Sequence, residues 1–542
     1  MKTKLFKINS ILLICGIAFF ASCEQNTIEP NPVDRFTEIT AFDTPEHCEL
    51  AVIGTYSTAQ SGVYPASPTS SRGYPFGAAS IIQSDMRGED MMNVEQFFQI
   101  TYESIYNAAP SSANNDAMWQ NSFSVICNAN IVIDGITQAG ESNVISATKA
   151  DEYIAENKFL RALTYHNLLI HFARPFADVG NNRYGLPYYD YPLNMQKNID
   201  RALDHGRDNL DVCYTKMIED LDDAESKLPA VHPVNHISRA TKGAAIALKT
   251  RILLHKGDWA GVKREAAKLV NAQFASPIGS YELTADPITP FDSYDDNSES
   301  IFSVENGSMR NSSTNGSLNT MFTVASRGAR GLVAVSPIGY NNPFWIANDK
   351  RRDMLELDAK GELYYTQKYV KDLAARSAYA PIIRYAEVLL NYAEAIIRGG
   401  GAVADALPYL NAVRNRSLKD VAADAYVAGD FADTKELMNA LLGERRIEFL
   451  AEGRRWEDIH RLLLDTDYTT GGIPAKAHVT NTRALIQATP PVPVYVIGGA
   501  TPAAALTLAA IPYSDRRCVW PIPESSTTRN PKLKSQQNAG WE

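Results

Sequence analysis

No apolar stretch in this 542-residue sequence is long enough to cross a membrane as a helix. The apolar run at residues 11–20 is far shorter than the roughly 20 residues that such a helix requires. Basic residues are also in the minority, since 52 Lys and Arg stand against 62 Asp and Glu and give a formal net charge of −10. Binding a phosphate backbone needs the opposite balance, so a nucleic-acid-binding protein is excluded.

Closely spaced cysteines are lacking as well. Of the six cysteines, two fall in the first 23 residues, and no C-x-x-C pair occurs, which argues against a zinc or thioredoxin-like site. The other four are far apart: Cys48, Cys127, Cys213 and Cys518. Because 45% of the residues are hydrophobic, the core can be large without disulfides, and both free buried thiols and three disulfide pairings stay open.

The signatures of common enzymes are absent too. The sequence has no G-x-S-x-G, H-E-x-x-H or Walker loop. Glu444, Glu448 and Glu452 share one helical face and could be imagined as catalytic carboxylates. Four arginines interleave with them: Arg445, Arg446, Arg454 and Arg455. A structural ion-pair network is therefore the better interpretation, and we expect no catalytic activity.

Metal-binding patterns are weak. His232 and His236 are four residues apart, but Pro233 disfavours the helix that would bring them together. Four carboxylates could supply oxygen ligands to calcium: Asp292, Asp295, Asp296 and Glu299. Their spacing does not match an EF-hand loop. We expect no cofactor, with calcium as the minor alternative.

The N-terminus has the features of a bacterial lipoprotein signal. Three lysines precede the apolar run, and the small residues Ala21 and Ser22 stand before Cys23. The pattern predicts a signal peptide over 1–22, lipid attachment at Cys23 and an extended polar tether over 23–43. An ordinary secretory signal followed by an incidental cysteine is the alternative.

The rest of the chain, 44–542, is predicted to be one mainly helical body. Apolar residues recur at helical spacing on both sides of Gly257-Asp258, where Gly257 suits a left-handed helix end and Asp258 an N-cap. Small residues and the Gly-Asp-Trp turn resemble a tetratricopeptide unit. Similar patterns at 153–172, 210–228, 385–410 and 437–450 predict helix pairs stacked into a superhelix with little β-structure.

Three segments interrupt the helical pattern. Residues 64–99 and 291–345 are rich in Gly, Ser, Asn and Pro and also carry many aromatic residues. A third, 471–512, alternates valine with other residues before Gly498-Gly499, which is compatible with a hairpin. Loops this long in a compact protein are usually functional, so the sequence predicts an irregular, loop-rich binding half.

Five blocks, taken in order, resemble the SusD/RagB family of surface nutrient-binding lipoproteins. They are 44–56 (TPEHCELAVIGTY), 155–176 (AENKFLRALTY running on to HFARPF), 384–395 (RYAEVLLNYAEA), 444–456 (ERRIEFLAEGRRW) and a C-terminal set made of WPIP, NP and QNAGW. Each block alone is weak, but five in sequence along nearly the whole chain are specific.

The resemblance implies a scaffold of tetratricopeptide-like helix pairs with an irregular binding half. It also implies a lipid-anchored protein on the outer face of the outer membrane, facing the medium and capping a SusC-like TonB-dependent transporter. Members of the family bind glycans, or in some cases peptides, and are not enzymes. Their ligand residues diverge, so the resemblance transfers none of them to this chain.

Ligand candidates therefore come from the chemistry of sugar binding. An aromatic ring stacks on the C–H face of a sugar while amide, carboxylate or guanidinium groups bind its hydroxyls. The irregular segments offer both kinds of group, and the candidates are Tyr74, Asp85, Phe97, Phe98, Tyr340, Asn342 and Trp345. Aromatic residues that fix a loop onto the helical core, with Asp85 in a solvated turn, are the alternative. A peptide ligand and a surface glycoside hydrolase stay open as other functions.

Overall fold

The computed structural model describes residues 40–60, 62, 72–95, 108–180, 182–234 and 236–542. Long helices dominate it: α2 (Pro45–Gln60), α5 (Ala113–Glu141), α6 (Ala147–Phe172), α8 (Leu210–Lys227), α9 (Lys242–Lys256), α10 (Trp259–Leu269), α15 (Tyr385–Arg398), α16 (Val403–Asn415), α18 (Thr434–Glu448) and α19 (Arg454–Arg461). The predicted 23–43 tether and 1–22 signal, with Cys23, lie outside the described residues except for 40–43.

The predicted hairpin around Gly257 is confirmed. Gly257 has φ +75° after α9, the left-handed conformation that glycine adopts without steric cost. The side chain of Asp258 then accepts a hydrogen bond from the backbone N–H of Gly261 at 2.9 Å and caps α10. The two helices consequently fold back on one another after a very short turn.

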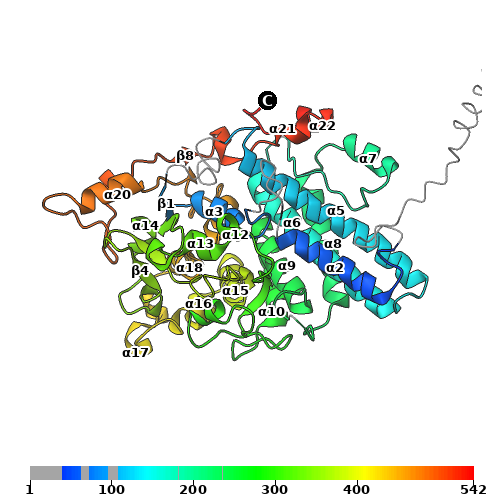
Figure 1. The fold of residues 1–542 in the computed structure, drawn as a ribbon. Helices are drawn as coiled ribbons and strands as arrows, with labels where there is room; N and C mark the ends of the chain where they lie inside the picture. The colour runs from blue at the N-terminus through cyan, green and yellow to red at the C-terminus, as the bar shows by residue number, and fades with distance from the viewer. Residues whose placement is uncertain (1–39, 61, 63–71, 96–107, 181, 235) are drawn as a thin grey trace, which may run out of the picture.

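Each long helix packs against the next. The series runs from α2 and α5 through α6, α8, α9 and α10 to α15, α16 and α18. Figure 1 shows the N-terminal members of the series side by side at the right, with short elements and loops at the left. The architecture is a mainly α, tetratricopeptide-like scaffold, as the helical periodicity predicts.

Short elements make up the irregular half and the outer edges. Four two-residue to five-residue antiparallel strand pairs are present in the described chain: β1 (Met91–Asn93) with β3 (Val333–Val335), β2 (Ser300–Val304) with β6 (Ala380–Arg384), β4 (Leu355–Leu357) with β5 (Tyr364–Thr366), and β7 (Gly472–Ile473) with β8 (Ile511–Pro512). The short helices are α3 (Ala78–Met86), α7 (Gln196–Leu203), α11 (Thr289–Asp292), α12 (Ser313–Gly316), α13 (Leu318–Phe322), α14 (Pro337–Tyr340), α17 (Val421–Asp424), α20 (Val479–Ile486), α21 (Glu524–Thr527) and α22 (Pro531–Ser535). Single 3₁₀ turns are η1 (Ala325–Arg327), η2 (Lys350–Arg352), η3 (Ala428–Asp430), η4 (Ala503–Ala505) and η5 (Arg516–Cys518).

Two details of the predicted segments differ from the structure. The 64–99 segment contains a regular helix, α3, every residue of which is buried. In the 471–512 segment the strands are β7 and β8 at its two ends, and the valines around Val494 belong to an irregular stretch. The alternation of valine with proline misled the hairpin prediction, because proline cannot donate the backbone hydrogen bond that a strand ladder needs.

Residues near the C-terminus join the scaffold to the irregular half. One buried hydrophobic cluster includes residues from Ala59 to Trp541 and so spans both halves. The buried guanidinium of Arg207 donates to the carbonyl of Gly185 at 2.7 Å, to the carbonyl of Gln536 at 3.0 Å and to the side chain of Asn538 at 2.7 Å. Arg207 therefore ties the segment after α6 to residues more than 300 positions later.

The predicted ion-pair network is present and buried. Arg351 contacts Glu444 at 2.6 Å and Glu448 at 2.9 Å, and Arg384 contacts Glu448 at 2.7 Å. Lys368 pairs with Glu452 at 2.6 Å. Strong attraction from these cations holds the pKa of Glu448 well below its usual range despite burial, so the carboxylate stays ionised.

The partners differ from those the sequence suggested. Arg445 and Arg446 do not pair with Glu444 or Glu448 of their own helix, and Arg454 pairs with Glu457 of α19. Arg445 pairs with Asp458 at 2.9 Å, while Arg446 and Arg455 bind Asp90 and Glu89 of the first irregular segment. Glutamates of α18 instead bind cations from the irregular half, which fixes that half to the scaffold.

Candidate functional site

Three tyrosines from distant parts of the chain form one aromatic cluster in the irregular half. Tyr340 stacks on Tyr364 with ring centroids 4.7 Å apart and 24° between the planes. Tyr495 stands edge-on to both rings, at 5.2 Å and 5.1 Å. We call Tyr340, Tyr364, Tyr495 and the adjoining Arg352 the tyrosine cluster.

Asn341 positions the loop that carries Tyr495. Its side-chain amide donates to the carbonyl of Val494 at 2.9 Å and accepts from the N–H of Val496 at 2.7 Å. The hydroxyl of Tyr495 donates to the carbonyl of Val335 at 3.1 Å. These bonds hold an otherwise irregular stretch against α14, so the Tyr495 ring meets Tyr340 in a defined orientation.

Strand alternation positions Tyr364. Successive side chains of a strand point to opposite faces. Tyr365 is buried in a hydrophobic cluster with Met92 and Leu363, whereas Tyr364 points the other way and remains half-buried. Across the ladder, Tyr364 pairs with Leu357, whose side chain is exposed.

The guanidinium of Arg352 packs against two aromatic rings, those of Tyr340 and Trp345. Its guanidinium lies 4.5 Å from the ring centroid of Tyr340 and 4.0 Å from that of Trp345. It also donates to the carbonyl of Tyr340 at 2.8 Å and to the carbonyl of Trp345. Burial lowers the pKa of Arg352 to about 10, which still leaves it charged at neutral pH and attracted to both rings.

The cluster has the chemistry of a carbohydrate platform. All three tyrosines are half-buried, so none of these residues is fully enclosed by the protein. The neighbouring Val496 and Ile497 are exposed, at 39% and 43%. Burial and the hydrogen bond with Tyr340 raise the pKa of Tyr364 to about 12, so its phenol stays protonated. Aromatic surface and phenolic hydroxyls together can bind the apolar face and the hydroxyls of a sugar.

Of the ligand candidates predicted from the sequence that fall in the described residues, only Tyr340 belongs to the half-buried tyrosine cluster. Trp345 is 1% exposed, and its ring lies beneath Arg352. Asn342 is buried and accepts the N–H of Phe344 at 3.0 Å. These two side chains fix the loop onto the protein core, which is the alternative to ligand binding given in the sequence analysis. Phe97 and Phe98 lie outside the described residues.

Tyr74 and Asp85 are also buried, at 0% and 3% exposure. Tyr74 lies within 3.4 Å of the side chain of Asn114. Asp85 accepts the N–H of Gly453 at 3.0 Å, and burial raises its pKa well above the usual range. A solvated turn at Asp85 was therefore the wrong alternative, since the carboxyl group lies inside the protein.

Sequence reasoning missed Tyr364, Tyr495 and Arg352. Tyr495 lies in the 471–512 segment, to which the sequence assigned no role, and Tyr364 lies 19 positions after the end of 291–345. The Tyr364-Tyr365 pair after a turn was the available signal. Their meeting with Tyr340 depends on tertiary contacts that no local pattern encodes.

The metal hypotheses find little support in the geometry. Glu299, one of the four possible calcium ligands, is buried and binds Arg384 at 2.5 Å as well as Arg416. Within the described chain, the one group of three possible ligand atoms lying within 4.8 Å of one another is Glu152, Glu156 and His232. Glu156 already accepts two hydrogen bonds from Arg239 at 2.6 Å, so a cation occupies this position.

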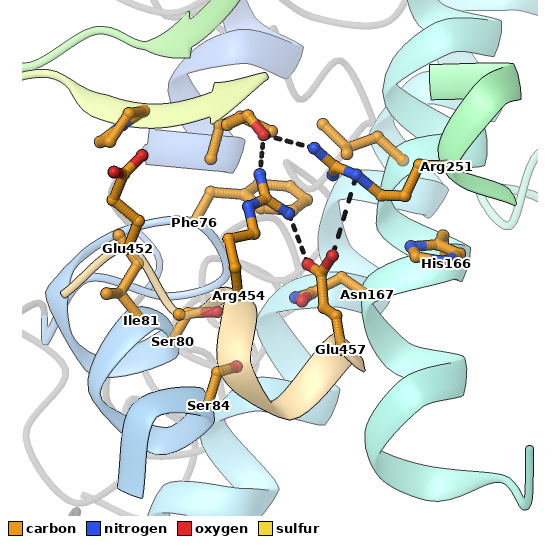
Figure 2. Close-up of a pocket in the computed structure, with 14 residues that line it drawn as sticks. Phe76, Ser80, Ile81, Ser84, His166, Asn167, Arg251, Glu452, Arg454 and Glu457 are labelled. Carbon is orange, nitrogen blue, oxygen red and sulfur yellow. Dashed lines mark hydrogen bonds and ion pairs between the residues drawn. The ribbon is translucent and has the colours of Figure 1, made fainter. Parts of the chain in front are cut away.

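A second polar site is a small internal cavity rather than a ligand pocket (Figure 2). Its volume is about 40 Å³, enough for roughly one water molecule. Arg251 and Arg454 both point toward it and both donate to the carbonyl of Ile382, and Glu457 pairs with Arg454 at 2.5 Å. Burial among these cations lowers the pKa of His166 well below its usual value, so the imidazole is neutral. No sugar ring fits here.

Family models match the chain in two long stretches. Residues 298–541 match the model described as the SusD family, and residues 61–254 match one described as "Starch-binding associating with outer membrane". The chain belongs to the SusD/RagB family. A SusD-like protein P2 from Formosa agariphila is 25% identical to this SusD/RagB protein over 513 residues, covering 86% of this chain and 92% of the relative.

Solved structures show the same fold. A SusD superfamily protein from Bacteroides fragilis superimposes with a TM-score of 0.71 at 22% identity, covering 91% of this chain and 99% of that chain. The surface glycan-binding protein A from Bacteroides uniformis gives a TM-score of 0.67 at 18% identity, covering 92% and 100%. Within the described residues of this SusD/RagB protein, no helix combines the length and apolarity needed to span a membrane.

Proposed function

We propose that this protein binds an oligosaccharide at the tyrosine cluster on the outer face of the outer membrane and delivers it, uncleaved, to a SusC-like TonB-dependent transporter. The observation that carries the binding step is the partly open stack of Tyr340 and Tyr364 with Tyr495 edge-on. The family model described as starch-binding and the glycan-binding protein from Bacteroides uniformis support a sugar as the ligand class.

The energetics of stacking set the expected effect. A ring on a sugar face contributes roughly 0.5 to 1.5 kcal/mol beyond its buried area. Tyr364→Ala removes one half of the central stack without opening the protein core, because the ring is half-buried. The variant should bind its glycan several-fold more weakly while its melting temperature changes little.

The experiment is a calorimetric screen of glycans, with analysis of the sugars after incubation. Tyr409→Ala is the matched control, because Tyr409 is also a half-buried tyrosine in a ring cluster, next to Tyr392 on the helical scaffold. Equal glycan affinity for Tyr364→Ala and Tyr409→Ala would remove the tyrosine cluster from the site. Binding of peptides instead of glycans would assign the peptide alternative, and shortened sugars would make the protein a glycoside hydrolase.

Lipid attachment at Cys23 is a separate part of the proposal, supported by the N-terminal signal pattern. Cys23→Ser should release the protein from membranes, and mass spectrometry of the native N-terminus should find a lipidated cysteine. Protease treatment of intact cells tests the outward orientation. An unmodified Cys23 in native protein would rule the anchor out.

Delivery to a transporter rests on the family relationship. Mild solubilisation of membranes should recover the lipoprotein together with a TonB-dependent transporter. Repeated recovery of the intact lipoprotein alone would indicate a binder that acts without such a partner.

A further inference from the structure

A large recess lies between α5, the segment 187–203 and the helices α21 and α22. Its volume is about 550 Å³, within the range of pockets that hold small organic ligands. The aromatic side chains at its base are packed together, with ring centroids 4.7 Å apart for Trp119 and Phe123 and 5.7 Å for Phe123 and Tyr189. Part of the lining is therefore a set of packed aromatic rings.

The segment that contains α7 contributes an aliphatic lining. Leu193, Ile199 and Leu203 line the recess from the segment that contains α7. Ile199 and Leu203 remain 37% and 43% exposed, although both are large apolar residues. These aliphatic side chains offer no hydrogen bond to a sugar hydroxyl, so this part of the recess favours an apolar group.

The helix α7 is packed only loosely. None of its residues is buried, and Figure 1 shows it on an excursion of the chain outside the scaffold helices. Its C-terminal end is held, since Asn530 donates to the carbonyls of Ala202 at 3.2 Å and His205 at 2.8 Å. Apolar side chains on a helix normally cover a core. Those of α7 instead border an open recess, and a ligand between α7 and α5 would complete their burial.

A cation stands at the rim. Arg529 lines the recess and is exposed, and it makes no ion pair with the described residues. Lys532, in the adjacent helix α22, pairs with Asp204 at 3.0 Å. The remaining polar side chains of the rim are neutral hydroxyls and amides such as Ser124, Asn128 and Ser526. The rim therefore complements an anionic group.

We propose that this recess binds an amphiphile, with its apolar chain or ring between α5 and α7 and its carboxylate or sulfonate paired with Arg529. The ligand class differs from the sugar proposed for the tyrosine cluster, and neither proposal depends on the other. A recess of this volume suits a small molecule better than a flat protein partner.

Cys127 supplies a local reporter. It lines the recess and is half-buried, whereas the free cysteines Cys48, Cys213 and Cys518 are buried. Bound amphiphile should shield the Cys127 thiol from a maleimide. Because the other three thiols are inaccessible in the folded protein, native labelling reports on the recess, and labelling of all four would reveal unfolding.

The test uses the chain from residue 23 onward carrying Cys23→Ser, which lacks the signal segment and with it Cys15, purified without detergent, with dodecanoate below its micelle concentration as the probe. Dodecanoate should bind in calorimetry and slow the labelling of Cys127. Arg529→Gln should weaken dodecanoate binding by about 1.4-fold to fivefold, the range for an exposed ion pair, and leave the binding of dodecanol unchanged. Unchanged labelling at saturating dodecanoate would overturn the proposal.

A space-filling variant locates the ligand. Ser124 is exposed on α5 and lines the recess, so Ser124→Trp should block it without disturbing the core, whereas Ser124→Ala should bind normally. Melting temperatures of both variants check the fold. Full dodecanoate affinity in Ser124→Trp would place the binding elsewhere and overturn the assignment. Equal affinity of Arg529→Gln and the parent chain would overturn the ion pair.

Discussion

Arg351 and Arg352 are adjacent in η2, yet the guanidinium of Arg351 contacts carboxylates and that of Arg352 contacts aromatic rings. Arg351 lies in the buried charge network and contacts Asp349 at 2.7 Å as well as Glu444. Arg352 lies between the rings of Tyr340 and Trp345. One 3₁₀ turn thus links the carboxylates that hold the irregular half to the aromatic cluster that we propose as the ligand site.

This arrangement predicts opposite phenotypes for the two arginines. Arg351→Ala strands buried carboxylates, so it should lower the free energy of unfolding by about 3 to 5 kcal/mol. Arg352→Ala strands no carboxylate, so it should cost less stability but release the Tyr340 ring and weaken glycan binding. Denaturant unfolding and calorimetry separate the effects. A more severe loss of stability in Arg352→Ala would contradict this division.

Asn341→Ala should weaken glycan binding through the position of Tyr495. The variant removes the two hydrogen bonds of Asn341 to residues 494 and 496, and we expect a stability loss of about 1 to 3 kcal/mol for the groups left unpaired. Asn411→Ala is the control, because the Asn411 amide donates to the carbonyl of Tyr426 at 2.8 Å on the scaffold side. Affinity should fall in Asn341→Ala alone, measured on proteins that remain folded. An unchanged affinity would show that Tyr495 needs no such support.

Gly443→Ala should destabilise the protein, contrary to the usual gain of about 1 kcal/mol for this change inside a helix. A Cβ at position 443 would lie 2.3 Å from the ring of Phe344. The backbone of Phe344 is fixed by Asn342 and by Arg414, which donates to its carbonyl at 3.1 Å. We expect a net loss of about 1 to 3 kcal/mol in denaturant unfolding. A more stable variant would mean that this loop adapts freely.

Asp85 should make stability fall as the pH rises. Burial raises its pKa in the folded state, so folding favours the protonated form. Its contribution is fully present below the unfolded-state pKa of about 3.9 and is lost as the pH rises through the folded-state pKa. Asp85→Asn keeps the acceptor for Gly453 and removes the titration.

The comparison of unfolding free energies between pH 4 and pH 8 tests this prediction. Parent and Asp85→Asn should be similar at pH 4, and the variant should be the more stable at pH 7. Parallel profiles over the whole range would show that Asp85 does not titrate between these states.

Local patterns were sufficient for the scaffold. Gly257 and Asp258 predicted a hairpin because a left-handed glycine and an N-cap act within a few residues. Local patterns did not predict the position of Trp345, because the sequence around a Trp flanked by Asn is the same whether the ring lies on a surface loop or is buried against a guanidinium. Which aromatic ring remains partly exposed depends on contacts with Arg352 and with the loop of Val494, which lies about 150 residues further along the chain.

Partner choice in the charge network shows the same limit. Spacing placed Glu444, Glu448 and Glu452 on one face and predicted an ion-pair network. It could not show that Arg384 and Lys368 would supply the cations, because those residues belong to other segments. The kind of interaction was therefore predictable, whereas the identity of each pair was not.

The contacts of Arg207 determine which part of the protein can complete its folding last. Its Nη1 donates to the carbonyl of Gln536 and the side chain of Asn538, which the ribosome adds 329 and 331 positions later. Until then the buried guanidinium has only part of its hydrogen bonds, and closing so long a loop is slow. The early helices can therefore form during synthesis, but the edge of the scaffold at residues 172–207 reaches its final state only after the last segment has been made.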